Sequence, residues 1–134
     1  MRSLRILPIL CCFTLLGCED FFDCLIAREP SIANKEFPIA TVGNYYEVSL
    51  NSEIKNEPRD NDYDYFFEVS GLPEGMDYSV DYRRLYIEGT PTESGFYRVN
   101  VRLDVDGPFR NGFENEDERL CNYSTSKTYI LEVE

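Results

Sequence analysis

The sequence predicts an all-β, antiparallel sandwich that follows a short leader. Apolar and polar residues alternate with a period of two from Phe37 onward, which is the period of a strand with one buried face. Turn residues, chiefly Gly, Pro and Asn, separate these runs at short spacings. No stretch combines helical apolar spacing with capping residues. With 134 residues, the chain has room for one small domain.

Residues 1–17 have the pattern of a secretory signal peptide. Arg2 and Arg5 make the first residues positive, and residues 6–16 form an apolar run interrupted only by Pro8 and Thr14. That run is too short to cross a bilayer, which takes about 20 residues. The sequence therefore predicts export of the chain and removal of its leader.

The end of the leader, Leu15-Leu16-Gly17-Cys18, resembles the lipobox of bacterial lipoproteins, although the family more often has a small residue in place of Leu16. The resemblance implies cleavage before Cys18, attachment of a diacylglycerol to its thiol, and acylation of the new amine by a chain such as palmitate. Two or three acyl chains make release from a membrane negligible. Residues 18–29 would then be a lipidated tether. In the enterobacterial sorting rule Glu19 is of the default class, which predicts an outer membrane location facing the periplasm.

The cysteine count agrees with this interpretation. Cys11 and Cys12 leave with the leader, and lipid consumes Cys18, so that Cys24 and Cys121 remain as one pair. An exported protein occupies a compartment that permits disulfides, so we predict that these two form a bond. A loop of that length is worth about 4–5 kcal/mol in the chain-entropy treatment. Two separate thiols are the alternative.

The domain proper is expected over residues 30–134. Its clearest alternation lies in four runs, at residues 45–50, 63–69, 97–105 and 128–133. One face of each run is apolar and the other polar, as in antiparallel sheets that are wet on one side. The one long irregular segment is expected at residues 106–122, and loops of that length are often functional.

A specific motif follows the second run. Gly71-Leu72-Pro73-Glu74-Gly75-Met76 and then Ile87-Glu88-Gly89-Thr90-Pro91 and Gly95-Phe96-Tyr97 resemble the Ig-like, cadherin-like repeat of bacterial surface proteins, over about residues 38–105. The resemblance implies an Ig-like or cadherin-like sandwich without catalysis at these positions. One departure is Asp81-Tyr82-Arg83-Arg84, where the family commonly has a Gly turn. The residues expected to shape turns are Gly71, Pro73, Gly75, Gly89, Pro91 and Gly95.

The charge of the chain limits its partners. The net charge is −12, and loss of Arg2 and Arg5 with the leader takes it to −14. Such a field repels nucleic acid and anionic headgroups and attracts a cationic partner. Part of the acidity gathers within residues 106–122, where it forms either a docking surface for a basic partner or a solvated loop. The residues of this acidic group are Glu114, Glu116, Asp117 and Glu118.

Two further groups of side chains each have two interpretations. Asp60, Asp62 and Asp64 alternate as Ca²⁺ ligands do, but the glycine and distant glutamate of an EF-hand loop are missing, so a solvated loop is favoured. No metal or cofactor site is predicted. The second group is either an aromatic–basic binding patch or ordinary cross-strand packing. It consists of Tyr78, Tyr82, Arg83, Arg84 and Tyr86.

The chain contains no histidine. This excludes Ser-His and Cys-His nucleophile pairs and the commonest zinc ligand. We therefore predict a non-enzymatic protein-interaction domain, anchored in the bacterial envelope, without a nucleic-acid partner. The alternatives are a structural or accessory subunit of an envelope complex, or an acidic inhibitor of a cationic toxin or hydrolase.

Overall fold

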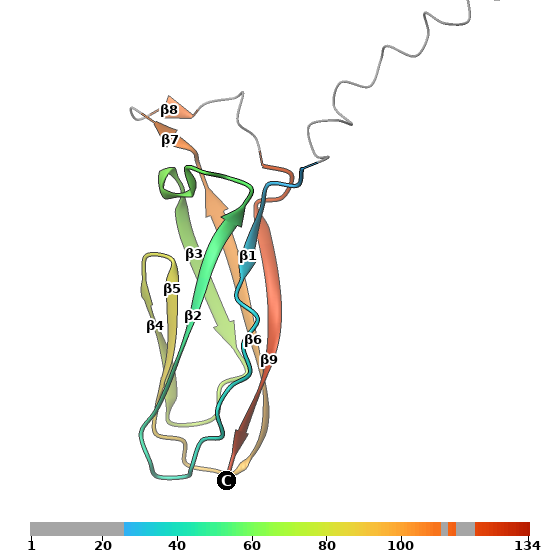
Figure 1. The fold of residues 1–134 in the computed structure, drawn as a ribbon. Coiled ribbons are helices and arrows are strands. Elements are labelled where there is room, and N and C mark those ends of the chain that lie inside the picture. Colours follow the sequence, from blue (N-terminus) through green and yellow to red (C-terminus); the bar gives the residue numbers. More distant parts are fainter. Residues whose placement is uncertain (1–25, 111–112, 115–119) are drawn as a thin grey trace, which may run out of the picture.

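The computed structural model describes residues 26–110, 113–114 and 120–134, and strands of two antiparallel sheets dominate them (Figure 1). The sheets have the strand orders β1-β2-β5-β4 and β3-β6-β9. These orders match A-B-E-D and C-F-G of a constant-type immunoglobulin domain, which confirms the predicted all-β, Ig-like sandwich. The bounds are β1 (Glu29–Ile32), β2 (Tyr46–Lys55), β3 (Asp64–Ser70), β4 (Met76–Asp81), β5 (Arg84–Gly89), β6 (Gly95–Asp106) and β9 (Ser124–Val133).

Three short elements complete the described chain. The 3-10 helix η2 (Asp60–Asp62) lies between β2 and β3. A small hairpin of β7 (Phe109–Arg110) and β8 (Phe113–Glu114) lies within the segment expected to be irregular. None of the described helical turns has the length and apolarity that a membrane span requires.

The core follows from the two-residue period. In β2 the residues Tyr46, Val48 and Leu50 are buried while Glu47 is exposed. In β3 the same alternation leaves Phe66 56% exposed although it is an aromatic residue. Facing side chains of both sheets interdigitate as in other aligned sandwiches. The side chains with no exposed area are Leu50, Leu85, Ile87, Val99, Val101, Leu103 and Leu131.

The segment after β1 joins the two sheets along one side. The Tyr129 hydroxyl donates to the carbonyl of Ala33 at 2.7 Å, and its ring stacks on Phe37 with centroids 4.8 Å apart. Ala40 then forms a parallel bridge with Val133. These contacts cover the edge of β9, so that side of the sandwich is closed by the chain itself.

Residues 41–44, 71–75 and 90–94 lie together at the end of the sandwich where the chain terminates, here named the motif end (Figure 1). The Thr90 amide donates to the carbonyl of Gly75 at 2.9 Å. Gly75 has φ +87°, and a Cβ atom there would overlap the carbonyl oxygen of Thr90. The two halves of the sequence motif therefore meet through main chain, at a distance that only glycine permits.

Candidate functional site

The other end of the sandwich collects the remaining connections, and we name it the loop end. It contains the β2–β3 loop with η2, the β4–β5 turn, the described parts of the β6–β9 segment (residues 107–110, 113–114 and 120–123) and residues 26–28, where the described chain begins (Figure 1). In immunoglobulin variable domains, loops at one end of the sandwich form the binding surface. By this analogy, the side chains of the loop end form the candidate site.

The β4–β5 turn has two central residues, because Asp81 pairs with Arg84 in the ladder. Tyr82 has φ +52°. A positive φ at the first central position matches a type II′ turn, which normally takes glycine there. An aromatic residue in this region of φ is uncommon and costs about 1–3 kcal/mol, so its side chain has to be held by other contacts.

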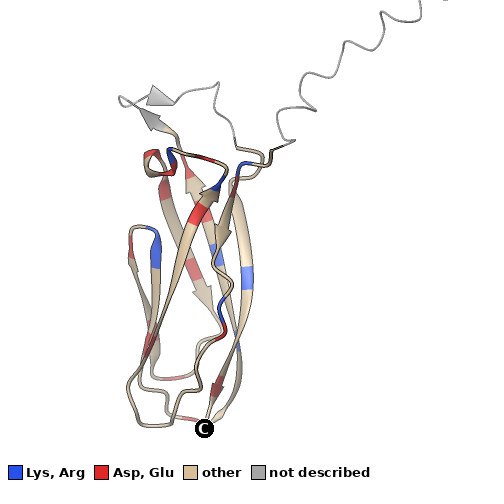
Figure 2. Cartoon of the chain, in the orientation of Figure 1, with Lys and Arg blue, Asp and Glu red and all other residues tan. Residues whose placement is uncertain are grey.

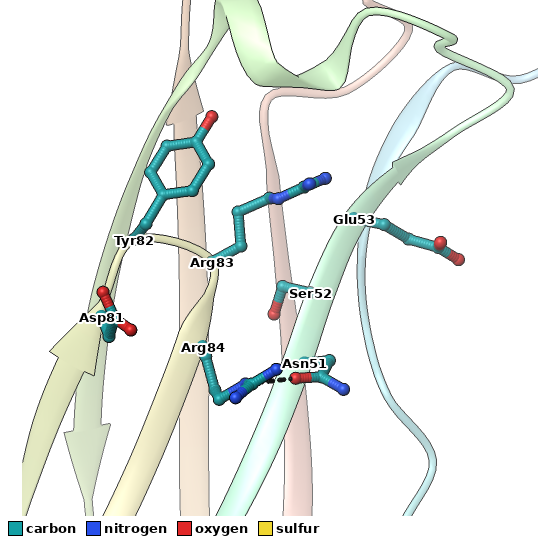
Figure 3. Close-up of a pocket in the computed structure, with 7 residues that line it drawn as sticks. All are labelled: Asn51, Ser52, Glu53, Asp81, Tyr82, Arg83 and Arg84. Atoms are coloured by element: carbon teal, nitrogen blue, oxygen red, sulfur yellow. Dashed lines mark hydrogen bonds between the residues drawn. The ribbon is translucent and has the colours of Figure 1, made fainter.

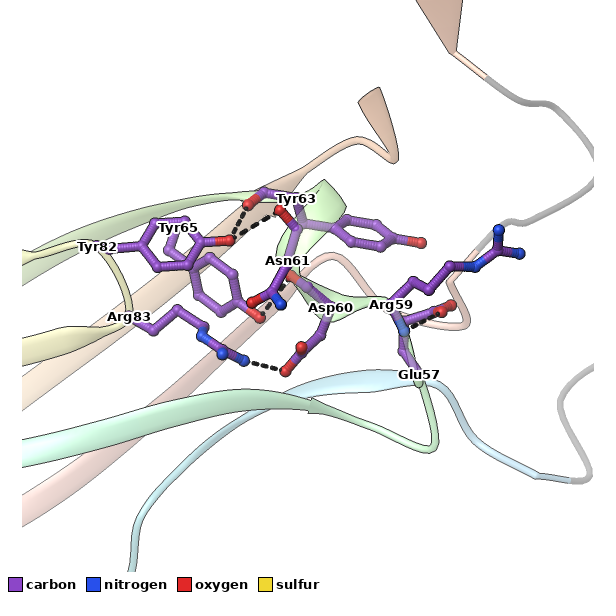
Figure 4. Close-up of polar contacts among 8 residues, drawn as sticks. All are labelled: Glu57, Arg59, Asp60, Asn61, Tyr63, Tyr65, Tyr82 and Arg83. Carbon is purple, nitrogen blue, oxygen red and sulfur yellow. Dashed lines mark hydrogen bonds and ion pairs between the residues drawn. The ribbon is translucent and has the colours of Figure 1, made fainter. Parts of the chain in front are cut away.

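Those contacts come from the β2–β3 loop (Figure 4). The Tyr82 hydroxyl lies 3.1 Å from the carbonyl oxygens of Asn61 and Tyr63, and it donates its proton to this pair of acceptors. The Tyr82 ring meets the ring of Tyr65 edge to face, with centroids 5.4 Å apart. The turn is thereby fastened to η2.

Arg83 completes the same cluster. Its guanidinium pairs with the carboxylate of Asp60, and its Cζ lies 5.5 Å from the ring centroid of Tyr82 and 6.0 Å from that of Tyr65. Burial raises the pKa of Tyr65, and the nearby Asp60 charge raises it further, while Arg83 opposes both. We call Asp60, Tyr65, Tyr82 and Arg83 the tyrosine–arginine cluster.

A polar groove lies beside this cluster. It forms because β5 pairs with β2 only as far as Asn51, while β2 continues to Lys55 past the end of the hairpin. The cavity measures about 510 Å³. We call it the β2 groove; its lining residues are Asn51, Ser52, Glu53, Asp81, Tyr82, Arg83 and Arg84 (Figure 3).

A second arrangement holds the start of the domain. Asn56 Nδ2 donates to the carbonyl of Ala27 at 2.9 Å, and the Cys121 amide donates to the carbonyl of Arg28 at 2.9 Å. Arg28 also pairs with Glu57 at 3.4 Å, and Glu57 is only 8% exposed. Residues 27 and 28 are therefore clamped between the β2–β3 loop and the end of the β6–β9 segment. We call this set of contacts the tether clamp.

Several predicted residues fall outside this description. Cys18, Cys24, Glu116, Asp117 and Glu118 lie outside the described residues. Glu114 belongs to β8. Docking through the acidic group and the disulfide of Cys121 therefore stay predictions.

Of the three alternating aspartates, Asp60 and Asp62 lie in η2. Asp60 pairs with Arg83, and Asp64 begins β3. Among the described residues, no group of three or more His, Cys, Asp or Glu side chains is arranged to hold a metal ion. The loop thus uses Asp60 as an ion-pair partner, a role that the sequence interpretation missed.

The motif residues all lie at the motif end, away from the groove. Gly71, Gly75, Gly89 and Gly95 have positive φ, and Pro73 and Pro91 are buried. A Cβ atom at Gly71 would overlap the carbonyl oxygen of Arg98. These positions form the turns and contribute nothing to the groove.

The proposed aromatic–basic patch is divided among three places. Tyr78 packs against the hydrophobic core. Arg84 and Tyr86 are bonded to each other, with Arg84 Nη1 3.3 Å from the Tyr86 hydroxyl. Tyr82, Arg83 and Arg84 all line the β2 groove, but Tyr78 packs against the core, so the hypothesis of a single patch of five side chains is wrong. Cross-strand packing explains Tyr78, since successive strand residues face opposite sides of the sheet.

Asn51 and Ser52 of the groove were missed by the sequence interpretation. A signal for Ser52 existed, because it occupies an inward position in the series that runs from Tyr46 through Leu50 to Ile54. A hydroxyl at a core-facing position calls for an explanation. Asn51 has no such signal, since it lies at an ordinary outward position.

No protein-family model matches the chain, and no curated protein matches it in sequence. Solved structures share its fold. An endo-fucoidan hydrolase from glycoside hydrolase family 107 superposes with TM-score 0.53 at 12% identity, covering 78% of this chain and 13% of that one. A Bacteroides fragilis protein assigned as an alpha-galactosidase/melibiase gives 0.49 at 14% identity, covering 83% and 19%. Titin domain M7 gives 0.44 at 12% identity, covering 81% and 97%.

The chain thus spans less than a fifth of the two larger proteins. At these identities the likeness concerns the fold alone. Strand order and structural likeness together define the class of protein, an Ig-like β-sandwich domain.

Proposed function

We propose that the chain is an envelope lipoprotein, held on a membrane by acylated Cys18, whose Ig-like domain is a non-enzymatic interaction module. The observation that carries the proposal is the tether clamp. Residues 27 and 28 lie close to where the described chain begins, and Asn56, Glu57 and Cys121 hold them there. Because residues 27 and 28 are bound to the loop end, an acylated Cys18 would hold this whole end of the domain close to the membrane.

The length of the tether gives the proposal a geometry. The clamped Ala27 lies nine positions after Cys18, so nine chain steps join them. At about 3.4 Å per extended residue they reach at most about 30 Å. The loop end would then remain within that distance of the bilayer, while the motif end, at the far end of the sandwich, points away from it.

The predicted disulfide would shorten the tether further. Arg28 follows Cys24 by four residues, and its carbonyl accepts a hydrogen bond from Cys121. A chain of four residues spans up to about 14 Å, which permits the Cys24 and Cys121 side chains to meet. The check is mass spectrometry of the non-reduced protein: a bond gives one cross-linked Cys24–Cys121 peptide, and two separately alkylated cysteines contradict it.

Charge favours a cationic protein partner. The mature chain would carry a net −14, and the acidic group Glu114, Glu116, Asp117 and Glu118 belongs to the sequence between β6 and β9. Attraction of this kind speeds association and weakens as salt rises. Replacement of Glu114, Glu116, Asp117 and Glu118 by Gln is expected to abolish capture of a basic partner from envelope extracts. Capture that persists in this variant, or that is indifferent to salt, contradicts the docking role.

The proposal contains no chemical step. The chain lacks histidine, which excludes the Ser-His and Cys-His nucleophile pairs. A purified, full-length protein that turns over substrates in a broad hydrolase screen would contradict the non-enzymatic part alone, because the anchor is independent of it.

The anchor is tested by substitution. Cys18→Ser removes the acceptor thiol, so the protein is expected to leave the membrane fraction and to lose incorporation of labelled palmitate. Cys12→Ser is the matched control, because that cysteine leaves with the leader and its loss changes neither readout. Density-gradient separation of the two membranes then tests the outer-membrane prediction. Retention of Cys18→Ser on the membrane in the presence of high salt overturns the proposal.

A further inference from the structure

The two sides of the sandwich differ in how their edges are covered. β1 and β9 lie side by side, and the segment after β1 closes that side through the bridge of Ala40 with Val133. The opposite side is formed by β4 and β3, each the last strand of its sheet (Figure 1). Within the described residues no further strand pairs with either of them. Such an edge offers unpaired main-chain groups to another chain.

The main-chain groups of β4 alternate in direction. The Thr90 amide bonds to the carbonyl of Gly75, so in an antiparallel ladder every second residue counted from Gly75 bonds to β5. Tyr78 and Val80 lie between those residues, and their amides and carbonyls therefore point away from the sheet. The Tyr78 amide agrees with this, because it donates to the carboxylate of Asp77 at 2.8 Å. A carbonyl of an added strand can replace that carboxylate.

The core-facing side chains at this edge are poorly covered. Tyr78 and Val80 lie opposite Ile87 and Leu85 of β5. The two β5 residues have no exposed area, whereas Val80 keeps 43% of its surface exposed and Tyr78 is half-buried. On β3, Phe67 is likewise only partly buried. Apolar residues of a strand added to β4 would lie directly opposite Tyr78 and Val80 and remove this area from water.

The outward side chains of this edge are acidic. β3 and β4 contain Asp and Glu but no Lys or Arg (Figure 2). On β4 the carboxylates are Asp77 and Asp81, which share one face of the strand. Asp77 lies directly opposite Glu88, a repulsive pair, and Arg84 lies opposite Asp81 but bonds to Asn51 of β2. Cations on an added strand, opposite the two aspartates, would therefore be favourable.

These charges disfavour a second copy of the chain as the occupant. Antiparallel pairing of two β4 strands about Ser79 places Asp77 of each copy opposite Asp81 of the other. Like charges directly opposite each other are destabilising, and each chain has a net charge of −12. The edge fits a partner of opposite charge.

We propose that β4 accepts an antiparallel strand of a cationic partner protein, in which basic and apolar residues alternate. Two apolar residues exchange main-chain hydrogen bonds with Tyr78 and Val80, and a Lys or Arg on each side of them lies opposite Asp77 and Asp81. The segment has the pattern basic–apolar–polar–apolar–basic. This inference rests on the proposed interaction role and names the partner's binding segment, and it requires neither the lipid nor the acidic group.

The test uses the full-length protein, purified in detergent, and fluorescent peptides whose binding is measured by anisotropy. The basic probe has the central sequence Lys-Val-Thr-Val-Lys. One control peptide has the same residues in the order Val-Val-Thr-Lys-Lys, and another has Glu in place of Lys. The basic probe is expected to bind at least about tenfold more tightly than either control. Equal binding of the reordered peptide, or no binding of the basic probe tighter than about 1 mM, overturns the proposal.

Methyl groups on the peptide nitrogens test the main-chain bonds. In antiparallel addition the amides of the two Val residues donate to β4, while the amide of the central Thr points to solvent. N-methylation of both Val residues is expected to weaken binding about tenfold or more, and N-methylation of Thr about twofold or less. Equal effects would contradict strand addition.

Variants of the protein locate the site. Val80→Pro removes an outward amide without breaking a bond to β5, as proline does on edge strands, and is expected to abolish binding. Asp77→Asn combined with Asp81→Asn is expected to weaken binding about fivefold, and it tests the site even if Val80→Pro disturbs the hairpin. The matched control, Glu47→Gln with Glu53→Gln, removes equal charge from exposed positions of β2, which β5 separates from β4, and leaves binding unchanged. Binding that survives both β4 variants contradicts the inference.

Failure of this inference is distinguishable from failure of the proposed function. The Gln variant of the acidic group and Cys18→Ser are both expected to bind the basic probe as the parent does. Absence of probe binding, together with salt-sensitive capture of a basic partner and an acylated Cys18, would refute the β4 site and leave the proposed function standing.

Discussion

The two ends of the sandwich are held by different kinds of contact. At the motif end, main chain meets main chain: the Thr90 amide bonds to Gly75, and Gly43 bonds to the carbonyl of Pro91. At the loop end, side chains reach between connections, as in the pair of Arg83 with Asp60 and the hydroxyl of Tyr82 on the β2–β3 loop. A close backbone contact such as that at Gly75 tolerates almost no substitution of its glycine, whereas a side-chain cluster can be altered residue by residue. The loop end is therefore the end at which binding properties can diverge while the fold is kept.

The largest expected effect concerns the motif end. Gly75→Ala places a Cβ atom against the carbonyl oxygen of Thr90 at a positive φ, so we expect a loss of at least ~3 kcal/mol in the free energy of unfolding. Gly43→Ala is the control, because Gly43 also has positive φ but has open space around its Cβ position, and about 1 kcal/mol is expected there. Denaturant unfolding measures both. Equal losses would mean that the close backbone approach does not stabilise this end.

The next effect concerns the loop end. Arg83→Met removes the Asp60 ion pair and the contacts with the Tyr65 and Tyr82 rings, so we expect a loss of about 1–2 kcal/mol. Arg102→Met breaks an exposed pair and is expected to cost about 0.5 kcal/mol or less. Thermal unfolding of the two variants compares the contribution of the tyrosine–arginine cluster with that of the exposed ion pair. A smaller loss for Arg83→Met than for Arg102→Met contradicts a stabilising role for the cluster.

A single hydroxyl gives a smaller effect. Tyr82→Phe removes the bond to the carbonyls of Asn61 and Tyr63 and leaves these acceptors without it, at a cost of about 1 kcal/mol. Tyr97→Phe at the motif end loses one exposed bond to Glu93 and is expected to cost about 0.5 kcal/mol or less. Equal losses in chemical denaturation, or a larger loss for Tyr97→Phe, would contradict a greater role of side-chain bonds at the loop end.

High pH tests the buried phenols. Burial raises the pKa of Tyr46 to about 12, above its ordinary value of 10. Below pH 10 the Tyr46 phenol is neutral in both the folded and the unfolded chain, so its ionisation does not lower the free energy of unfolding. As the pH rises from 10 to 12, the unfolded chain ionises first and stability falls.

Tyr46→Phe checks that assignment and has the smallest effect at neutral pH. Within the described chain the buried Tyr46 hydroxyl has no hydrogen-bond partner, so its removal is expected to leave stability unchanged or to raise it by up to about 1 kcal/mol. The variant is also expected to lose less stability than the parent between pH 10 and 12. An unchanged alkaline slope would assign the effect to other tyrosines.

The sequence predicted the motif end and the sandwich well, for a physical reason. Glycine and proline at fixed offsets constrain the backbone locally, and strand alternation is a short-range signal, so residues such as Gly75 and Val101 could be placed without any tertiary knowledge. The edge strand β4 was not predicted because its residues are only partly buried and carry a weak alternation.

The loop end was not predictable in the same way. Arg83 and Asp60 are 23 residues apart in the chain, and many acidic residues were equally available as partners. Their pairing depends on the positive φ of Tyr82, which no local sequence rule indicates. Polarity at an inward strand position, as at Ser52, was the one signal that pointed to the groove.

The most direct measurement on the central proposal is intact mass spectrometry of the native protein extracted from its own membranes. A mature chain that begins at Cys18 and carries a diacylglycerol, with or without a third acyl chain on its amine, is the predicted result. An unmodified chain, or a terminus at any other residue, would contradict the anchored interaction module, while the Ig-like fold would stand.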